Sequence, residues 1–345
     1  MTWQTDPEEG SVWAVQGAKS GARMARLQLQ SATRSAQGII EPPDLQVRAA
    51  TIPDGTVTVA AGGCVVAGRE QNFQGSYFGY NVGLDSVSIA PTGSGGGRSD
   101  LVVARVEDPT VEGPNVWEHA LTDQLIYTRV IQGVSATAED VPAGVVYSAV
   151  PLARIDIPAN TATITQDMVT DLRTMLNPRT ERTMRTMYGQ GLEDGRYDLA
   201  DFKTDFERWP QHNWEGLLIP SWATQLSVRA DWMNALYPAP GAPGPTTRDA
   251  RGQVRVGFIG SGGNNLYTTA PAYNFNPQGD TNGFRASTGL ADTLTVPAAM
   301  RGMSVSLRMY AKADAATTKY LVADGFSNFV VDIEWREVPV SAATL

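Results

Sequence analysis

Stretches in which apolar and polar residues alternate cover most of the chain after residue 38. In the first half, "LQVRA" (45–49) and "GTVTVAAG" (55–62) have the two-residue period of strands with one buried face. "DLVVARV" (100–106) is a continuous apolar run, as expected for a strand buried on both faces. In the second half, alternation returns in "QLSVRADW", "GQVRVGFI", "MSVSLRMYA" and "FVVDIEWREV". The pattern predicts a mainly β protein.

Two segments share one pattern, "ATIPDGTVTV" (50–59) and "IDIPANTATI" (155–164). Each has Ile-Pro, a turn pair and then alternating threonines. Proline fixes φ and favours an extended conformation for the preceding residue, and β-branched residues then resume a strand. We therefore expect two similar hairpin corners.

Helical spacing occurs at two places. In "TQDMVTDLRTML" (165–176), Met168, Leu172 and Met175 would lie on one side of a helix. Thr165 is its expected N-cap, and the exposed apolar side is a candidate interface between subunits. Residues 17–39 form the only basic segment, which fits a solvated helix or an extended arm that grips a neighbour.

These patterns divide the chain into four parts. An N-terminal arm or helix (1–37) precedes a β-rich anchoring domain (38–177), and a short, charged connector with some helix follows (178–213). The last part (214–345) has regular short strands and long polar loops, which predict a β-sandwich of the jelly-roll type.

Composition narrows the functional classes. The net charge is -9 and no basic block is present, so we expect no nucleic-acid partner. The single cysteine, Cys64, lies in an apolar strand and is expected to be buried and unreactive. The N-terminus lacks the features of a secretion signal, and no stretch is long and apolar enough to span a membrane.

Catalytic and cofactor motifs are not found. There is no His-Glu-x-x-His motif, no Gly-x-Ser-x-Gly motif, and only two histidines, His119 and His212. Asp156 alternates with Ile155 and Ile157 on a predicted strand, so we expect it to face solvent. We expect Asp167 and Asp171 to cap a helix or pair with Arg173 or Arg154. The remaining enzymatic alternative is a glycosidase that uses the carboxylates at 198–207, although a charged connector would look the same. The expectation is no enzyme, no cofactor and no metal.

Aromatic residues supply the candidate binding site. Tryptophan rings stack on sugars, but they also anchor cores and interfaces. The loop over 260–284 has the Tyr, Asn and Gly content of recognition surfaces, and also that of a solvated loop. The candidate glycan or receptor contacts are Trp209, Trp214, Asn264, Asn265, Tyr267, Tyr273 and Asn274.

The order of four segments resembles a known family. These are "QGIIEPPDLQV", "GTVTVAAGGCVVAGR", "SVSIAPTGSGGGRSDLVVARVEDP" and "PLARIDIPANTATITQDMVTDLR". The order is similar to the N-terminal domain of minor tail or baseplate proteins of siphophages that infect Gram-positive, especially actinobacterial, hosts. The resemblance covers about 38–176, and more loosely 214–338, where β-sandwich domains are often appended. "VTDLR" has Val where Ile is more usual, and "GPNVWEHALTDQLIYTRVI" has no close counterpart.

The resemblance implies a structural protein of the virion at the tail tip, made in the host cytoplasm and released by lysis. Such proteins are often homotrimers that contact other tail or baseplate proteins, with distal domains facing the host and its cell-wall glycan. Two alternatives remain open: a tail-associated carbohydrate-binding module or glycan hydrolase, and a bacterial surface or toxin-delivery component of phage-like origin.

Overall fold

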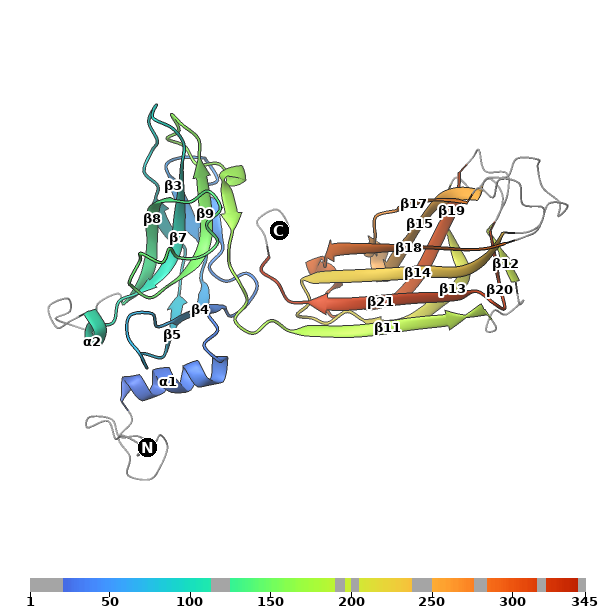
Figure 1. Cartoon of the computed structure of the whole chain (residues 1–345), viewed down its shortest axis with the longest axis horizontal. Coiled ribbons are helices and arrows are strands. Elements are labelled where there is room, and N and C mark those ends of the chain that lie inside the picture. Colours follow the sequence, from blue (N-terminus) through green and yellow to red (C-terminus); the bar gives the residue numbers. More distant parts are fainter. Residues whose placement is uncertain are drawn as a thin grey trace, which may run out of the picture. The chain divides into compact units, whose positions relative to one another are not determined.

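A computed structural model describes residues 21–112, 125–189, 196–199, 205–237, 250–275, 284–314 and 321–340 (Figure 1). The chain forms two compact units. The first comprises Met1–Pro178 together with Val338–Leu345, and the second comprises Arg179–Glu337. The mainly β prediction is confirmed, because both units are built from antiparallel sheets. No helix within the described ranges is long and apolar enough to cross a membrane.

In its described residues, the first unit contains one longer helix, two short helical turns and three small sheets. The sheet orders are β1-β4-β5, β2-β3-β6 and β10-β9-β7-β8. The elements are α1 (Ala22–Thr33), β1 (Gly38–Ile39), β2 (Val47–Ala49), β3 (Thr56–Val59), β4 (Gly62–Ala67), β5 (Ser76–Asn81), β6 (Asp85–Ser88), β7 (Arg98–Val106), α2 (Pro109–Glu112), β8 (Ile126–Val134), β9 (Ala149–Ile157), η1 (Gln166–Met168) and β10 (Val169–Asp171).

Strand β7 is buried on both faces, as its apolar run predicts. Val102 and Ala104 belong to one apolar cluster, whereas Leu101 and Val103 belong to another. Cys64 of β4 lies in the first cluster with 1% of its surface exposed. Burial raises the pKa of its thiol to about 12, which keeps it protonated and confirms that it packs as a small apolar residue.

The two Ile-Pro corners are turns that contact each other. The first joins β2 to β3, and Asp54 accepts hydrogen bonds from the amide and hydroxyl of Thr56 at 2.7 Å each. The second follows β9, and its Ile164 N–H donates to the backbone oxygen of Asp54 (2.7 Å). Only the first is a simple hairpin, since the second leads through η1 before β10 pairs back onto β9.

The helix predicted over 165–176 is wrong. Only one helical turn, η1, forms, and the β-branched Val169 and Thr170 then enter β10. The Thr165 hydroxyl bonds the Asp167 carboxylate and makes no cap to the backbone. Met168 and Met175 pack on one apolar cluster, and Leu172 packs on the other. The three residues therefore share no face and are held within their own unit.

The second unit is a two-sheet sandwich. Its elements are β11 (Thr180–Tyr188), β12 (Arg196–Asp198), β13 (Glu207–Leu218), β14 (Gln225–Tyr237), β15 (Ala250–Ile259), η3 (Ser261–Gly263), β16 (Asn265–Tyr267), β17 (Ala272–Phe275), β18 (Phe284–Thr295), η4 (Ala298–Met300), β19 (Ser304–Ala313), β20 (Val322–Asp324) and β21 (Asn328–Arg336). β11 and β13 show that the predicted helical connector is wrong for its described residues, because they pair into the sandwich.

The strand order is that of a jelly roll. β20 and β21 pair along the same strand, β14, and β11 and β12 pair with them in turn. β16 and β17 likewise both pair with β15. When each such set is treated as one interrupted strand, the sheets read β18-β14-β21-β11 and β13-β19-β15-β16. The chain then passes between the sheets at every connection except β15–β16, as in jelly rolls.

Large aromatic residues fill the space between the two sheets. Trp209, Trp232 and Trp335 are fully buried, together with Phe258 and Phe329. The rings of Trp209 and Phe329 meet edge to face across the core with centroids 5.9 Å apart. Burial of these large side chains contributes to the hydrophobic stabilisation of the sandwich.

Candidate functional site: polar clamps and a cationic sheet face

Arg173, in the "TDLR" segment, is a buried structural clamp. Its side chain has no exposed surface and forms an ion pair with Asp171 (2.6 Å). Its remaining donors reach the backbone oxygens of Pro42 (3.2 Å), Asp44 (2.6 Å) and Val340 (2.8 Å). A buried guanidinium is tolerated when its donors are matched in this way. Arg173 therefore fastens three segments of the first unit that lie far apart in the sequence.

The other carboxylates of the resembling segments have the same structural role. Residues i and i+2 of a strand share a face, which lets Arg98 pair with Asp100 (2.7 Å) and Arg154 pair with Asp156 (3.0 Å). The Asp156 carboxylate also accepts from the Ser99 hydroxyl at 2.7 Å, which joins β9 to β7. The expectation that Asp171 pairs with Arg173 is confirmed, whereas Asp156, which was expected to face solvent, is 40% exposed and also pairs with Arg154.

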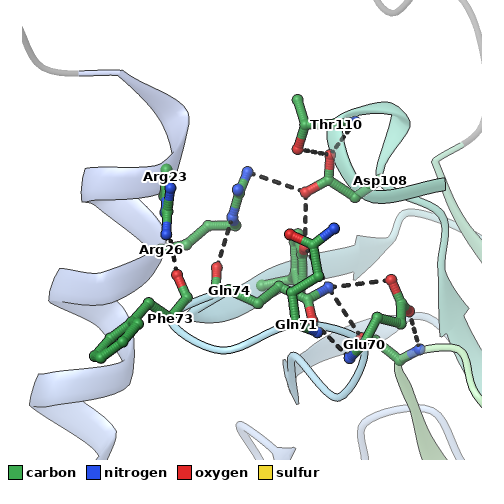
Figure 2. Close-up of polar contacts among 10 residues, drawn as sticks. Arg23, Arg26, Glu70, Gln71, Phe73, Gln74, Asp108 and Thr110 are labelled. Atoms are coloured by element: carbon green, nitrogen blue, oxygen red, sulfur yellow. Dashed lines mark hydrogen bonds and ion pairs between the residues drawn. The ribbon is translucent and has the colours of Figure 1, made fainter. Parts of the chain in front are cut away.

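Helix α1 is held to the first unit by a polar cluster (Figure 2). Arg26 forms an ion pair with Asp108 at 3.1 Å and donates to the backbone oxygen of Gln74 (3.0 Å), while Arg23 donates to that of Phe73 (3.2 Å). Gly75 permits this contact, because a Cβ there would lie 2.6 Å from the Arg26 backbone. The helical prediction for this basic segment is confirmed over Ala22–Thr33, and the helix is docked rather than only solvated.

Asp108 is the centre of that cluster. Burial acts to raise the pKa of its carboxyl, but hydrogen bonds from Thr110 and Tyr77 and the charge of Arg26 outweigh it, so the pKa lies below its ordinary value. The Tyr77 hydroxyl donates to Asp108 at 2.6 Å, and burial together with this bond raises the tyrosine pKa. Asp108 is therefore ionised and Tyr77 is neutral at neutral pH.

Several predicted glycan contacts lie inside the sandwich. Trp209 is 1% exposed and accepts a hydrogen bond from the Trp232 indole at its backbone oxygen (3.0 Å). Tyr273 is 5% exposed, and its hydroxyl donates to the backbone oxygen of Lys312 (3.4 Å). Trp214 is half-buried and its indole donates to Thr186 (3.3 Å). Trp209 and Tyr273 are corrected to core residues, because packing between the sheets uses their apolar surface.

The remaining predicted contacts lie near the surface of the second sheet. Asn264 belongs to the connection between β15 and β16, and Asn265 is the first residue of β16 and is exposed. Asn264 donates to the backbone oxygen of Ser261 (3.1 Å), which closes this turn. Tyr267 of β16 is half-buried, and Asn274 of β17 is exposed. These four are candidates that the structure leaves on one sheet of the sandwich.

Tyr267 borders a cluster of cations that we call the cationic face, formed by Arg208, Arg255, Arg308 and Lys312 around Tyr310. In the strand register, Tyr310 of β19 lies opposite Arg208 of β13 on one side and Arg255 of β15 on the other. Arg308 and Lys312 lie two residues before and after Tyr310 on its own strand. Residues placed in these ways point to the same face of a sheet.

Arg255 is stacked between aromatic rings. Its guanidinium carbon lies 4.0 Å from the ring centroid of Phe206 and 4.1 Å from that of Tyr267. Gly257 makes room for this stack, because a Cβ there would lie 2.8 Å from both the Tyr267 and Tyr310 rings. These contacts are cation–π interactions, and because the Arg255 Nε is buried, the terminal N–H groups are the ones that could bind an external acceptor.

The cations of this face have no carboxylate in ion-pair contact among the residues that the structure describes. Arg208 donates to the side chain of Asn213 (3.2 Å), and Arg308 donates to the hydroxyl of Ser306 (3.1 Å), which in turn donates to Glu215 (2.9 Å). A groove of about 340 Å³ adjoins the cluster and is lined by Phe206, Glu207, Arg208, Gln211, Arg308 and Tyr310.

The outer face of the other sheet is different. Its three arginines on β11, β14 and β21 are each paired: Arg182 with Asp332, Arg229 with Asp231 at 3.2 Å, and Arg336 with Glu334 at 2.7 Å. The arginines of one sheet face are therefore ion-paired, whereas those of the cationic face are not ion-paired with any described carboxylate. Sequence reasoning missed the cationic face, although "SLRMYAK" places Arg308, Tyr310 and Lys312 at every second residue.

The carboxylates of the glycosidase alternative are largely outside the described residues. Asp201 and the side chain of Asp198 lie there, while Asp205 and Glu207 are described near the start of β13. In the part of the chain that the structure describes, no three metal-ligating side chains gather into a cation site.

The first unit also carries an exposed apolar stripe. Phe78, Tyr80, Val82 and Leu84 alternate along β5 and the turn after it, with exposed fractions of 63%, 59%, 89% and 75%. Phe78 and Tyr80 share one side of β5, and Val82 and Leu84 follow in the turn. Gly63 lies beside Phe78 and Tyr80, since a Cβ there would lie within 3.5 Å of side-chain atoms of Ile40, Phe78 and Tyr80. Clusters of exposed apolar residues are typical of protein contacts.

No protein-family model matches the chain, and no curated protein matches it either. Among solved structures, the alignment with T=1 particles derived from infectious bursal virus covers 92% of this chain and 80% of that chain. Its TM-score is 0.27 and the sequence identity is 11%. The VP2 subviral particle of infectious bursal disease virus gives a TM-score of 0.25 and 12% identity, and the alignment covers 92% of this chain and 82% of that chain. The T13 particle of infectious bursal disease virus gives a TM-score of 0.27 and 12% sequence identity, and the alignment covers 92% of this chain and 82% of that chain. These scores are too low to support a conclusion, and the jelly-roll assignment depends on the strand order alone.

Proposed function

We propose that the chain is a structural subunit of a phage tail tip or baseplate. The observation that supports this most is that the segments resembling minor tail proteins are those that assemble the clamps of the first unit. Arg98, Asp100, Arg154, Asp156 and Arg173 all lie in those segments and hold its strands together. The resemblance therefore extends to residues on which the fold depends.

In this proposal the first unit anchors the protein in the particle. The stripe Phe78, Tyr80, Val82 and Leu84 replaces Met168, Leu172 and Met175 as the contact with neighbouring subunits, including other copies in a homotrimer. Its apolar side chains would leave water on assembly, at about 25 cal/mol for each Å² that is buried. The sandwich then presents its surface to the host without catalysing a reaction.

The test is to locate the chain in purified particles. A tag at the C-terminus, imaged with labelled antibody, is expected at one end of the tail in a fixed number of copies. A tagged Phe78→Ser/Tyr80→Ser variant should fold but be lost from particles. A matched variant, Met184→Ser, changes an apolar residue that is 56% exposed on the sandwich and should still be incorporated. Absence of the unmodified chain from particles would overturn the proposal.

Carbohydrate binding by the sandwich is a second candidate, because aromatic rings and amides lie together around Tyr267. Incubation of the purified protein with host-wall polysaccharide separates the alternatives. Retention without new reducing ends supports a binding module, whereas release of fragments supports a hydrolase and contradicts the non-enzymatic role.

A further inference from the structure

We infer that the cationic face binds an anionic polysaccharide, with Arg208, Arg255, Arg308 and Lys312 contacting its charged groups. This inference rests on the proposed function, because it names the ligand class of the sandwich that the proposed subunit would present.

The first reason is that no carboxylate among the described residues forms an ion pair with the cations of this face. Four cations surround one tyrosine ring, and directly opposed or neighbouring like charges destabilise a sheet. The opposite sheet of the same sandwich pairs its outer-face arginines Arg182, Arg229, Arg285 and Arg336 with carboxylates. The fold can therefore neutralise such residues, and the cationic face retains a local positive potential on a chain of net charge -9.

The second reason is that Arg255 is positioned before any ligand arrives. The ring centroids of Phe206 and Tyr267 lie 4.0 and 4.1 Å from its guanidinium carbon, and its Nε is buried without a hydrogen-bond partner. A fixed guanidinium loses little conformational entropy on binding, and its in-plane donors match carboxylate or phosphate oxygens. Such an arrangement favours an anion over a neutral ligand.

The third reason connects the anion to a saccharide. The groove of about 340 Å³ beside Arg208 and Arg308 is in the range of small-ligand sites and has the ring of Phe206 in its wall. Aromatic rings present apolar surface to the C–H faces of sugars. Asn265, two residues before Tyr267 on β16, shares its face of the strand and adds an exposed amide group there.

Nucleic acid is the competing polyanion, and the charges disfavour it. Binding a nucleic-acid backbone involves neutralising about 6–10 phosphates along a continuous basic surface. The cationic face supplies four cations, and the chain outside it is acidic overall. A polymer whose charges are spaced by sugar rings fits this small footprint better.

The experiment is affinity electrophoresis of the full-length protein in gels containing one of three polymers. These are polygalacturonate, which carries carboxylates, a poly(glycerol phosphate) and neutral dextran. Fluorescence anisotropy with labelled oligo(dT) is the nucleic-acid arm. Arg308→Gln and Arg255→Gln each remove one charge of the face, and Arg255→Lys keeps the charge but loses the planar fork. Arg229→Gln is the matched control, because it removes a paired arginine from the opposite face.

We expect retardation by one or both anionic polymers and none by dextran. Arg308→Gln and Arg255→Gln should each weaken binding about tenfold, Arg255→Lys should weaken it less than Arg255→Gln, and Arg229→Gln should bind like the unmodified protein. Binding should also weaken as salt increases. Unchanged binding by the Arg308 and Arg255 variants, equal binding of dextran, no binding of any polymer, or tighter binding of oligo(dT) would overturn the inference.

Two further comparisons separate a loss of binding from a loss of folding, and this inference from the proposed role in the particle. Arg308→Gln is compared with Arg229→Gln in thermal unfolding, so a loss of binding with unchanged unfolding is assigned to the contact. The assay uses purified protein, so a negative result leaves the particle location to be decided by imaging. Conversely, a chain that is missing from particles could still bind an anionic polymer.

Discussion

Arginines have opposite environments in the two units. In the first unit, Arg173 is buried and its donors meet a carboxylate and three backbone oxygens. On the cationic face of the sandwich, Arg255 and Arg308 have no ion-paired carboxylate among the described residues. Matched donors stabilise a fold, whereas unmatched cations at a surface are available to an external ligand. The same residue type therefore indicates structure in one unit and recognition in the other.

The largest expected effect comes from Arg173→Ala. Removing the guanidinium leaves buried backbone oxygens unsatisfied and Asp171 unpaired, and losing one partner of a buried pair costs about 3–5 kcal/mol. Hydrogen exchange of peptides from the first unit should show the loss. Arg34→Ala, at an exposed arginine of the same unit, is the control. Equal protection of both variants would show that the clamp has no stabilising role.

Acid should release helix α1 from the first unit. The folded pKa of Asp108 lies below its ordinary value of 3.8, so its stabilising effect is present above 3.8 and is lost as the pH falls through the folded pKa. Pepsin cleavage within Ala22–Thr33 should therefore accelerate as the pH falls below the folded pKa of Asp108.

Asp108→Asn should remove this pH dependence and weaken the docking of α1 by about 1–3 kcal/mol even at neutral pH, because the charged acceptor is lost. Glu139→Gln, at an exposed carboxylate, is the matched control. A variant that keeps the acid-induced step of the unmodified protein would contradict the role of Asp108.

Gly257→Ala should disturb the cationic face directly. The added Cβ would lie 2.8 Å from the Tyr267 and Tyr310 rings, which must move and release Arg255 from its stack. We expect a loss of about 1–3 kcal/mol of unfolding free energy from overpacking, together with weaker anion binding. Gly325→Ala is the control, since no atom lies within 4 Å of its added Cβ. If the two alanine variants behave alike, the stack is not constrained as described.

The smallest effect is expected for Arg229→Gln. Its pair with Asp231 is solvent-exposed, and such pairs contribute about 0–1 kcal/mol. Urea unfolding monitored by tryptophan fluorescence is suited to this variant, because five of the eight tryptophans lie in the second unit. A destabilisation as large as that of Gly257→Ala would remove the distinction between the two sheet faces.

The pattern of apolar and polar residues was sufficient to predict the β class, the burial of β7 on both faces and the sandwich of the second unit. It failed where local and tertiary preferences compete. The spacing of Met168, Leu172 and Met175 satisfies a helix, but pairing of β10 with β9 imposes strand geometry on the middle of the segment. Likewise, the charged residues of β11 resemble a connector, because an edge strand with one outer face in water carries polar residues.

The candidate site was harder to predict, because it depends on register between strands. Tyr267 was selected from loop composition, whereas Arg208, Arg255 and Arg308 come from three strands that are distant in the sequence. Trp209 and Tyr273 were selected because aromatic residues bind sugars, yet the space between two sheets requires the same residues. Only the fold separates inward-facing from outward-facing aromatics.

The most direct test of the account is the unfolding free energy of Arg308→Gln/Lys312→Gln in about 0.1 M salt, where charges within about 10 Å still interact. If the cationic face is kept for a ligand, removing two of its four neighbouring charges relieves repulsion, and stability should stay equal or rise while anion binding is lost. A clear loss of stability in the double variant, approaching that of Arg173→Ala, would contradict the account, because it would show that these cations hold the fold together.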